Sequence, residues 1–241
     1  MIPLSFSTNN TPNEITRIRG KILADLMAQD AGFARVPVRS ISTKTLKRML
    51  QLYDTWFFSS ALLKYYSTFD VTMSSRLLKS AGKFITPGRK NAKTCEIRMS
   101  SDFLFRLGTG TYKLNGLIAH SPQEAFLIVF EHELCHAIEN AIYGSTGHSS
   151  RFMFFAHGIF GHTDTVHSLP TRQQEAAASG IKVGSRVSFD FEGKRLVGYV
   201  SYVGKTARVM VPDPRGNYHL ESNPHQKFLK YQVPLSMLHV Y

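Results

Sequence analysis

The sequence predicts an α+β protein with two domains: helices with a small antiparallel sheet, then a small β-barrel. Two observations predict this. Apolar residues recur at helical spacing, with capping signals, through much of the first 168 residues. Beyond residue 180, short segments alternate apolar and polar residues between turns, as strands do. At 241 residues the chain can bury one or two cores.

The N-terminal part is expected to be helical after a disordered start. Residues 1–13 are polar and lack the basic start and apolar core of a signal peptide, so we expect disorder and no signal peptide. The apolar spacing of residues 15–29 and 43–67 predicts two helices. They begin the first domain, which we expect to cover residues 14–168.

Strands are expected over residues 69–100, around a basic loop at 86–94. Cys95, Ile97 and Met99 alternate with charged residues, which is typical of a half-buried strand.

A long buried helix is predicted from Ser121 to Gly144. Ser121, Pro122 and Glu124 form a capping-box pattern with proline at the first helical position. The next residues are apolar on all sides, and Gly144 is a typical helix stop.

This helix carries His132-Glu133-Leu134-Cys135-His136. Residues four apart share a helix face, so His132 and His136 can bind one zinc ion, while Glu133 is placed to act as general base. A catalytic zinc site needs three protein ligands and an open fourth position. The segment therefore predicts a zinc hydrolase with a single ion. The alternative is a purely structural role, in which the segment is a buried helix with two hydrogen-bonded histidines.

The third ligand is predicted to be His148, which follows a Gly-Ser-Thr-Gly turn and precedes a helix over 151–160. Glu139 and Ile142 exclude the metzincin spacing. Glu175 is the alternative third ligand. His157, His162 and His167 are interpreted as hydrogen-bonding or packing residues. Tyr143, His157 and Arg151 stay open as groups that stabilise the oxyanion.

The segment His132 to Ala137, followed by Gly147-His148-Ser149-Ser150-Arg151-Phe152, resembles the SprT-like zinc metalloproteases, which include the Spartan DNA–protein crosslink proteases. Serine stands here where that family has glycine after the third histidine. Softer matches are 52–58, 74–76, 81–83 and 95–100. The resemblance covers about residues 45–165. It implies a zincin-like fold, peptide-bond hydrolysis, a role in DNA repair, and a substrate-pairing edge strand, for which 95–100 is the candidate.

The net charge of +12 is unevenly distributed. It is +11 over residues 1–116, −4 over 117–168 and +5 over 169–241. Such basic regions suit phosphate contacts, although a solvated basic surface is the plain alternative. The predicted nucleic-acid contacts are Arg76, Lys79, Lys83, Arg89, Lys90 and Lys93.

Residues 169–180 are expected to be a linker, and residues 181–241 a β-barrel of SH3-like size. Cys95 and Cys135 form no Cys-x-x-Cys pair, which excludes the cysteine zinc ribbon that SprT-like proteins often carry. Lys194, Arg195, Lys205 and Arg208 could contact nucleic acid instead; otherwise this domain braces the protease.

The predicted function is that of a zinc-dependent endopeptidase, and the expected substrates are DNA-associated proteins, as in the repair of DNA–protein crosslinks. The alternative is a nucleic-acid-binding module with a structural zinc and no protease activity; a zinc peptidase without a nucleic-acid role is a third interpretation. Two cysteines outside any pairing pattern predict an intracellular protein, in cytoplasm, nucleoid or nucleus. The lack of a long apolar run predicts no membrane partner. We also expect a monomer.

Overall fold

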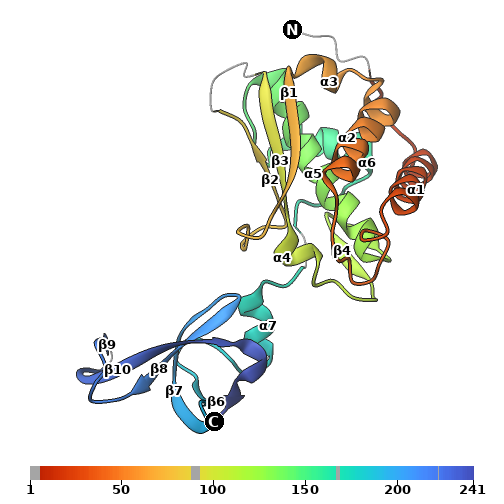
Figure 1. Ribbon diagram of the computed structural model, residues 1–241. Coiled ribbons are helices and arrows are strands. Elements are labelled where there is room, and N and C mark those ends of the chain that lie inside the picture. Colours follow the sequence, from red (N-terminus) through yellow and green to blue (C-terminus); the bar gives the residue numbers. More distant parts are fainter. Residues whose placement is uncertain (1–5, 88–92, 167–168, 222) are drawn as a thin grey trace. The chain divides into compact units, whose positions relative to one another are not determined.

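The computed structural model describes residues 6–87, 93–166, 169–221 and 223–241 (Figure 1). The chain forms two compact units, Met1–Leu169 and Pro170–Tyr241, called here the first and second unit. Each has its own hydrophobic core, and helices and strands occur in both. The prediction of an α+β protein is confirmed at this level.

The chain ahead of the first helix is held against α6 (Ser150–Phe160). The backbone N–H of Asn10 donates to the Gly158 carbonyl at 2.9 Å, and the Asn10 side chain donates to the Ile159 carbonyl at 3.1 Å. Thr11 and Glu14 then form a capping box at the start of α1 (Pro12–Gln29). The predicted disorder over 1–13 is therefore wrong for residues 6–13; residues 1–5 lie outside the described residues.

The predicted helix over 43–67 is interrupted. Helix α2 (Thr43–Phe58) ends where Ser59 and its neighbour adopt left-handed backbone conformations. The Asp54 carboxylate then accepts the Leu62 backbone N–H at 2.9 Å and starts the short α3 (Leu62–Tyr65). Apolar spacing continues through this break, which is why the pattern predicted one helix.

Strand β3 (Thr94–Ser100) lies in the centre of the first unit's sheet. It pairs in parallel with β1 (Thr68–Ser74) and antiparallel with β2 (Gly82–Ile85). Two predictions are wrong: the sheet is mixed rather than antiparallel, and residues 95–100 are not an edge strand. Alternation along one strand shows that one face is buried but does not reveal its neighbours.

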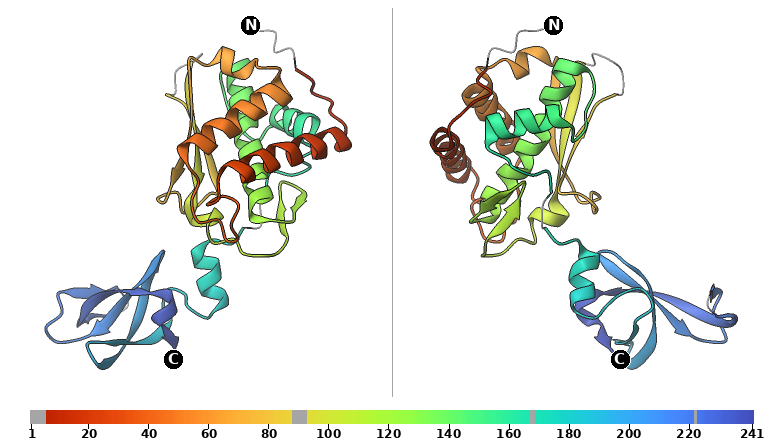
Figure 2. Two further views of the ribbon diagram at one scale, coloured as in Figure 1. Left: turned by 45° about the vertical axis from the view of Figure 1, so that its right-hand side comes forward. Right: turned by 180° about the vertical axis from the view of Figure 1, so that it is seen from behind.

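Helix α5 (Pro122–Tyr143) passes through the core of the first unit, between the sheet and α1 (Figures 1 and 2). Its apolar residues are buried on all sides, as expected for a central helix. Further elements of this unit are α4 (Ser101–Leu104) and the hairpin of β4 (Tyr112–Leu114) and β5 (Leu117–Ala119). Among the described residues, no helix has the length and apolar character that a membrane span requires.

The second unit is a six-stranded sheet with one helix. The strand order is β11-β6-β7-β8-β10-β9, with antiparallel neighbours. The elements are α7 (Arg172–Ala178), β6 (Arg186–Phe191), β7 (Lys194–Val203), β8 (Thr206–Pro212), β9 (Tyr218–Leu220), β10 (Asn223–Pro234), the 3₁₀ turn Leu235–Met237 and β11 (His239–Val240).

Two predictions for this part of the chain need correction. Most of the predicted linker 169–180 is α7, which is capped by Thr171 and buries Ala176 in the second unit's core. The short run of three alanines is helix-forming rather than flexible. The second prediction is the β-barrel. Strands β11 and β9 are the two end strands of the sheet, and no pairing between them closes the sheet into a barrel within residues 169–221 and 223–241.

Candidate metal centre

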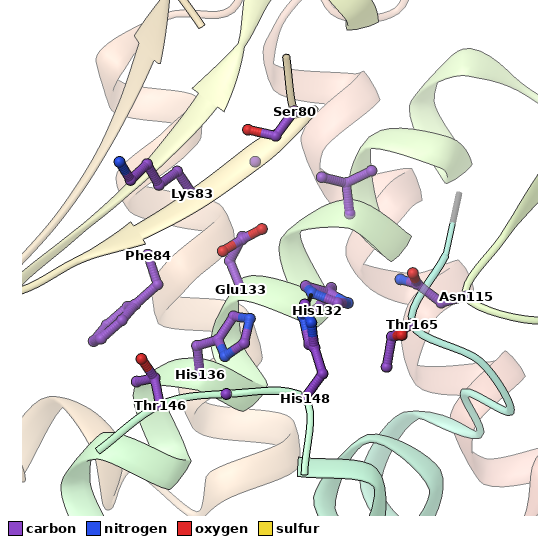
Figure 3. Close-up of a pocket in the computed structure, with 13 residues that line it drawn as sticks. Ser80, Lys83, Phe84, Asn115, His132, Glu133, His136, Thr146, His148 and Thr165 are labelled. Carbon is purple, nitrogen blue, oxygen red and sulfur yellow. Dashed lines mark hydrogen bonds between the residues drawn. The ribbon is translucent and has the colours of Figure 1, made fainter. Parts of the chain in front are cut away.

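Helix α5 positions the first two predicted ligands. The Ser121 side chain accepts the Glu124 backbone N–H at 3.0 Å, and Gly144 ends the helix with φ of 70°. The predicted capping box is not closed, because the Glu124 carboxylate accepts the His120 N–H at 2.7 Å instead. His132 and His136 lie one turn apart and point to the same side (Figure 3).

His148 joins them from the turn between α5 and α6. Its Nε2 atom lies 3.0 Å from Nε2 of His132, and one ligand atom from each of the three histidines lies within 4.8 Å of the others. The three predicted metal ligands are therefore brought together. Glu175, the alternative third ligand, lies on α7 in the second unit and is not part of this cluster.

The donor set fits zinc. Three imidazole nitrogens are a common catalytic zinc set, and Zn–N bonds of about 2.0–2.1 Å place tetrahedral donors about 3.3 Å apart. Burial, with a smaller contribution from His148, lowers the pKa of His136 to about 4, so this imidazole is neutral and free to coordinate. The buried Phe152 ring lies 4.8, 4.6 and 5.0 Å from the rings of His132, His136 and His148.

Glu133 points into the same pocket and is only 6% exposed (Figure 3). Burial raises the pKa of this carboxyl to about 8, while a backbone hydrogen bond from Phe84 acts in the opposite direction. Gly82 on β2 allows the approach: a Cβ atom there would lie 2.6 Å from Oε1 of Glu133. No local pattern indicates this contact, since residues 82 and 133 are far apart in the chain.

The pocket has a volume of about 300 Å³. Strand β2 and the residues before it form one wall, and the turn before α6 forms another. The polar side chains along these walls, besides the histidines and Glu133, belong to Ser80, Lys83, Asn115, Thr146 and Thr165.

None of the three proposed oxyanion groups lines this pocket. Tyr143 is exposed at the end of α5, with the Arg151 guanidinium 4.5 Å from its ring centre. His157 is exposed on α6. Asn115 and Thr165 do line the pocket. Their distance from the metal ligands along the sequence does not distinguish them from the three residues that lie outside it.

Glu139 holds the turn that carries His148. Its buried carboxylate accepts the Gly147 backbone N–H at 2.8 Å and the Ser149 hydroxyl at 3.1 Å. These two residues flank the third ligand. Glu139 is not part of the histidine cluster, and its contacts hold the backbone on both sides of the third ligand.

A buried polar network lies behind α5. The Glu131 carboxylate accepts Nε of Arg19 at 2.8 Å and the Tyr53 hydroxyl at 2.8 Å, and Nε2 of His162 lies 3.1 Å from it. The guanidinium also donates to the Phe160 carbonyl at 3.1 Å. His162 is thus a hydrogen-bonding residue, as interpreted from the sequence, whereas His167 lies outside the described residues.

The predicted nucleic-acid contacts are scattered. Arg76 and Lys79 are exposed between β1 and β2, and Lys83 lines the metal pocket. The Lys93 ammonium lies 3.3 Å from the ring centre of Tyr65. Arg89 and Lys90 lie outside the described residues, and nucleic-acid contact by this set stays a prediction.

Comparison with protein-family models and with curated proteins gives no match to this chain. The chemistry of the site is therefore argued from its own geometry.

Proposed function

We propose that this chain is a zinc-dependent endopeptidase. One observation carries the proposal. Three imidazoles are placed to bind the same ion, and the buried carboxyl group of Glu133 faces the same pocket. A purely structural zinc site is normally closed by a fourth protein ligand. Among the described residues, these three histidines are the one group of three or more histidine, cysteine, aspartate or glutamate side chains placed to share an ion.

Each residue has a distinct task. Zinc held by His132, His136 and His148 would polarise a scissile carbonyl and acidify a water molecule. Glu133 would accept the proton of that water and return it to the leaving amine. Its burial excludes bulk water from the carboxylate, and Gly82 leaves the room that its position requires.

Strand β2 is the proposed substrate-binding strand. It is an edge strand, it lines the metal pocket, and its outer edge is not paired with another described strand. An extended peptide could add to this edge through main-chain hydrogen bonds, which give little sequence specificity. This assignment replaces the 95–100 segment and agrees with a zincin-like fold for the first unit, which we propose together with an SH3-like fold for the second.

Membership of the SprT-like family is part of this proposal. Of the residues that carry the resemblance, the three histidines and Glu133 line one pocket, and the Phe152 ring contacts all three histidines. Ser149, which replaces the family's glycine, donates to Glu139. The replacement is therefore compatible with the site.

We further propose DNA-associated proteins as substrates, because the chain carries a net charge of +12. The test is cleavage of a basic protein such as histone, with and without DNA and with and without chelator. Wild type should cleave only with metal, and Glu133→Gln should bind one zinc ion yet cleave at least about 100-fold more slowly. His157→Ala, an exposed histidine away from the pocket, is the matched control and should cleave normally.

The outcomes separate the alternatives. Normal cleavage by Glu133→Gln contradicts the mechanism. Zinc and DNA binding without any cleavage by wild type favours the nucleic-acid-binding module. If the rate of cleavage is the same with and without DNA, and the chain does not bind DNA, the protein is a zinc peptidase without a nucleic-acid role.

A further inference from the structure

The sheet of the second unit has one face turned to its core and one turned away from it. Val187, Val200 and Val209 lie on the core face of β6, β7 and β8. Because side chains alternate along a strand, the residues next to them point to the opposite face. The register places Arg186 beside Tyr199, Tyr199 beside Met210, and Met210 beside Lys230.

A β-bulge adds a second tyrosine to this outer face. Tyr199 and Tyr202 are three residues apart, and in a regular strand they would point to opposite sides. The register shifts by one residue between Val200 and Tyr202, so that Tyr202 lies beside Arg208. Both rings are exposed, at 39% and 45%.

Cations accompany the rings. The Arg208 guanidinium lies 5.5 Å from the ring centre of Tyr202, and the Lys230 ammonium lies 4.2 Å from that of Tyr218 on β9. Tyr218 is 42% exposed. We call the outer-face residues Arg186, Tyr199, Tyr202, Arg208, Lys230 and Gln232 the tyrosine face; Met210 lies on the same side of the sheet but is buried.

The charge of this face is positive. None of its six residues is acidic, and the second unit, Pro170–Tyr241, carries ten Lys or Arg against five Asp or Glu. Asp190 lies on the same side of the sheet toward the other end of β6, opposite Arg195. A ligand for this face should therefore be an anion that also offers flat rings.

We infer that the tyrosine face binds single-stranded nucleic acid, with bases stacked on Tyr199 and Tyr202 and phosphates near Arg186, Arg208 and Lys230. Exposed aromatic rings on a positively charged surface are the general means of binding unpaired bases. A duplex hides the faces of its bases and would use only the cations. An acidic peptide would pair with the cations but offers no bases to stack on the exposed rings.

The bulge has a consequence for this assignment. It places two rings on one sheet face, opposite Met210 and Arg208, which are two positions apart on β8. Gly204 makes room for the second ring, since a Cβ atom there would lie 2.8 Å from Cε1 of Tyr202. The pair is thus built by two local departures from a regular strand rather than by chance exposure.

The experiment measures binding of the full chain to a fluorescent oligothymidine of about 15 nucleotides, by anisotropy, against the corresponding duplex. Tyr199→Ala and Tyr202→Ala should each weaken binding about 5- to 100-fold, because each removes one stacked base. Tyr199→Phe and Tyr202→Phe keep the ring and should bind like wild type. Thermal unfolding of each variant confirms that the fold is retained.

Two matched controls lie on the core side of the sheet by register. Phe191→Ala removes a ring of 45% exposure, and Lys194→Ala removes a charge paired opposite it on β7. Neither should change binding by more than about twofold. Lys230→Ala should reduce the slope of log affinity against log salt by about 0.7, the value for one phosphate contact on a single strand.

The inference is overturned if the tyrosine-to-alanine variants bind like wild type, if the duplex binds as tightly as the single strand, or if polyglutamate competes as well as the oligonucleotide. It does not depend on the metal centre. Cleavage of a short peptide without nucleic acid tests the proposed peptidase separately, so one idea can fail while the other holds.

Discussion

The Glu139 carboxylate fixes the position of His148 through hydrogen bonds to the two residues that flank it. It is buried, and its two oxygens accept one hydrogen bond on each side of this ligand. A loop of small residues, 144–147, would otherwise sample many conformations. Residues that hydrogen-bond around a metal ligand and fix its orientation contribute to metal affinity.

Glu139→Ala should therefore weaken zinc binding about 10- to 100-fold, as is typical for loss of an orienting partner. Glu139→Gln keeps one hydrogen-bond acceptor and should weaken zinc binding less. Ser149→Ala removes a single hydrogen bond, so its zinc affinity should be closest to that of wild type. Competition with a chromophoric chelator measures the dissociation constant. Equal affinity for wild type and Glu139→Ala would show that the turn holds its position without this carboxylate; Glu221→Ala, an exposed carboxylate, is the control.

Gly82→Ala should slow peptide cleavage about 10- to 100-fold without loss of zinc. The added Cβ would lie 2.6 Å from Oε1 and 2.7 Å from Cγ of Glu133, so the carboxylate must move. A shift of about 1 Å in a catalytic group can cost that much in rate. Steady-state kinetics with metal analysis tests this. Gly108→Ala, where no atom lies within 4 Å of the added Cβ, should behave like wild type.

At the scale of elements, Asp30 joins α1 to α2. Its carboxylate accepts hydrogen bonds from the backbone N–H groups of Gly32, Phe33 and Ser42 and from the Thr45 hydroxyl. Burial raises its pKa, but the bonds from Ser42, Thr45, Phe33 and Gly32 outweigh this and lower the pKa to about 2. The carboxylate form therefore favours the folded state.

This predicts a loss of stability in acid. The contribution of Asp30 is fully present above its unfolded pKa of about 4 and is lost as the pH falls through about 2. Asp30→Asn should lower the free energy of unfolding by about 1–2 kcal/mol at pH 7 and by much less at pH 2.5. Urea unfolding at both pH values measures the difference. An equal loss at both values would mean that the charge of Asp30 is unimportant.

Two helical glycines should respond in opposite directions to alanine. Gly20 is exposed within α1 with no atom within 4 Å of a built Cβ, so Gly20→Ala should stabilise the chain by about 0.5–1 kcal/mol. Gly158 lies in α6, where a Cβ would collide with the Thr8 carbonyl oxygen. Gly158→Ala should destabilise the first unit and release residues 6–11, which proteolysis with mass spectrometry detects. Resistance equal to wild type would contradict the role of Gly158.

Local patterns predicted the elements that depend on near neighbours. Helix α5, its serine cap, its Gly144 end and the approach of His148 all follow from residues within about one helix length of one another. The central position of β3, the proximity of Gly82 to Glu133 and the bulge beside Tyr202 depend on partners distant in sequence. Strand pairing is set by the whole sheet, so no local pattern could reveal these.

At the scale of the molecule, the metal ligands and Glu133 belong to the first unit, whereas the tyrosine face belongs to the second. Each unit has its own core. The division after Leu169 lies near residue 170, where the composition predicts a change of character, whereas the three alanines of the predicted linker belong to α7.

Separate cores predict separate thermal transitions. Zinc at about 100 times its dissociation constant should stabilise the first unit by about 2.7 kcal/mol and raise only its transition. A chelator should reverse this shift and leave the second unit's transition unchanged. Calorimetry of the full chain, with zinc and with EDTA, measures both. A single transition that moves as a whole with zinc would show that the two units unfold together.

The network around Glu131 also determines the rotation of α5 about its own axis. Consecutive helical residues project about 100° apart, so a carboxylate tied to Arg19 of α1 and Tyr53 of α2 directs the following residue, His132, to one fixed azimuth. His136 shares that direction one turn later. Turning the ligands away from the pocket would break an ion pair that is buried from solvent. The contacts of Glu131 with α1 and α2 therefore orient the two histidines of α5 before a metal ion binds, so that metal binding requires little rearrangement of the ligands.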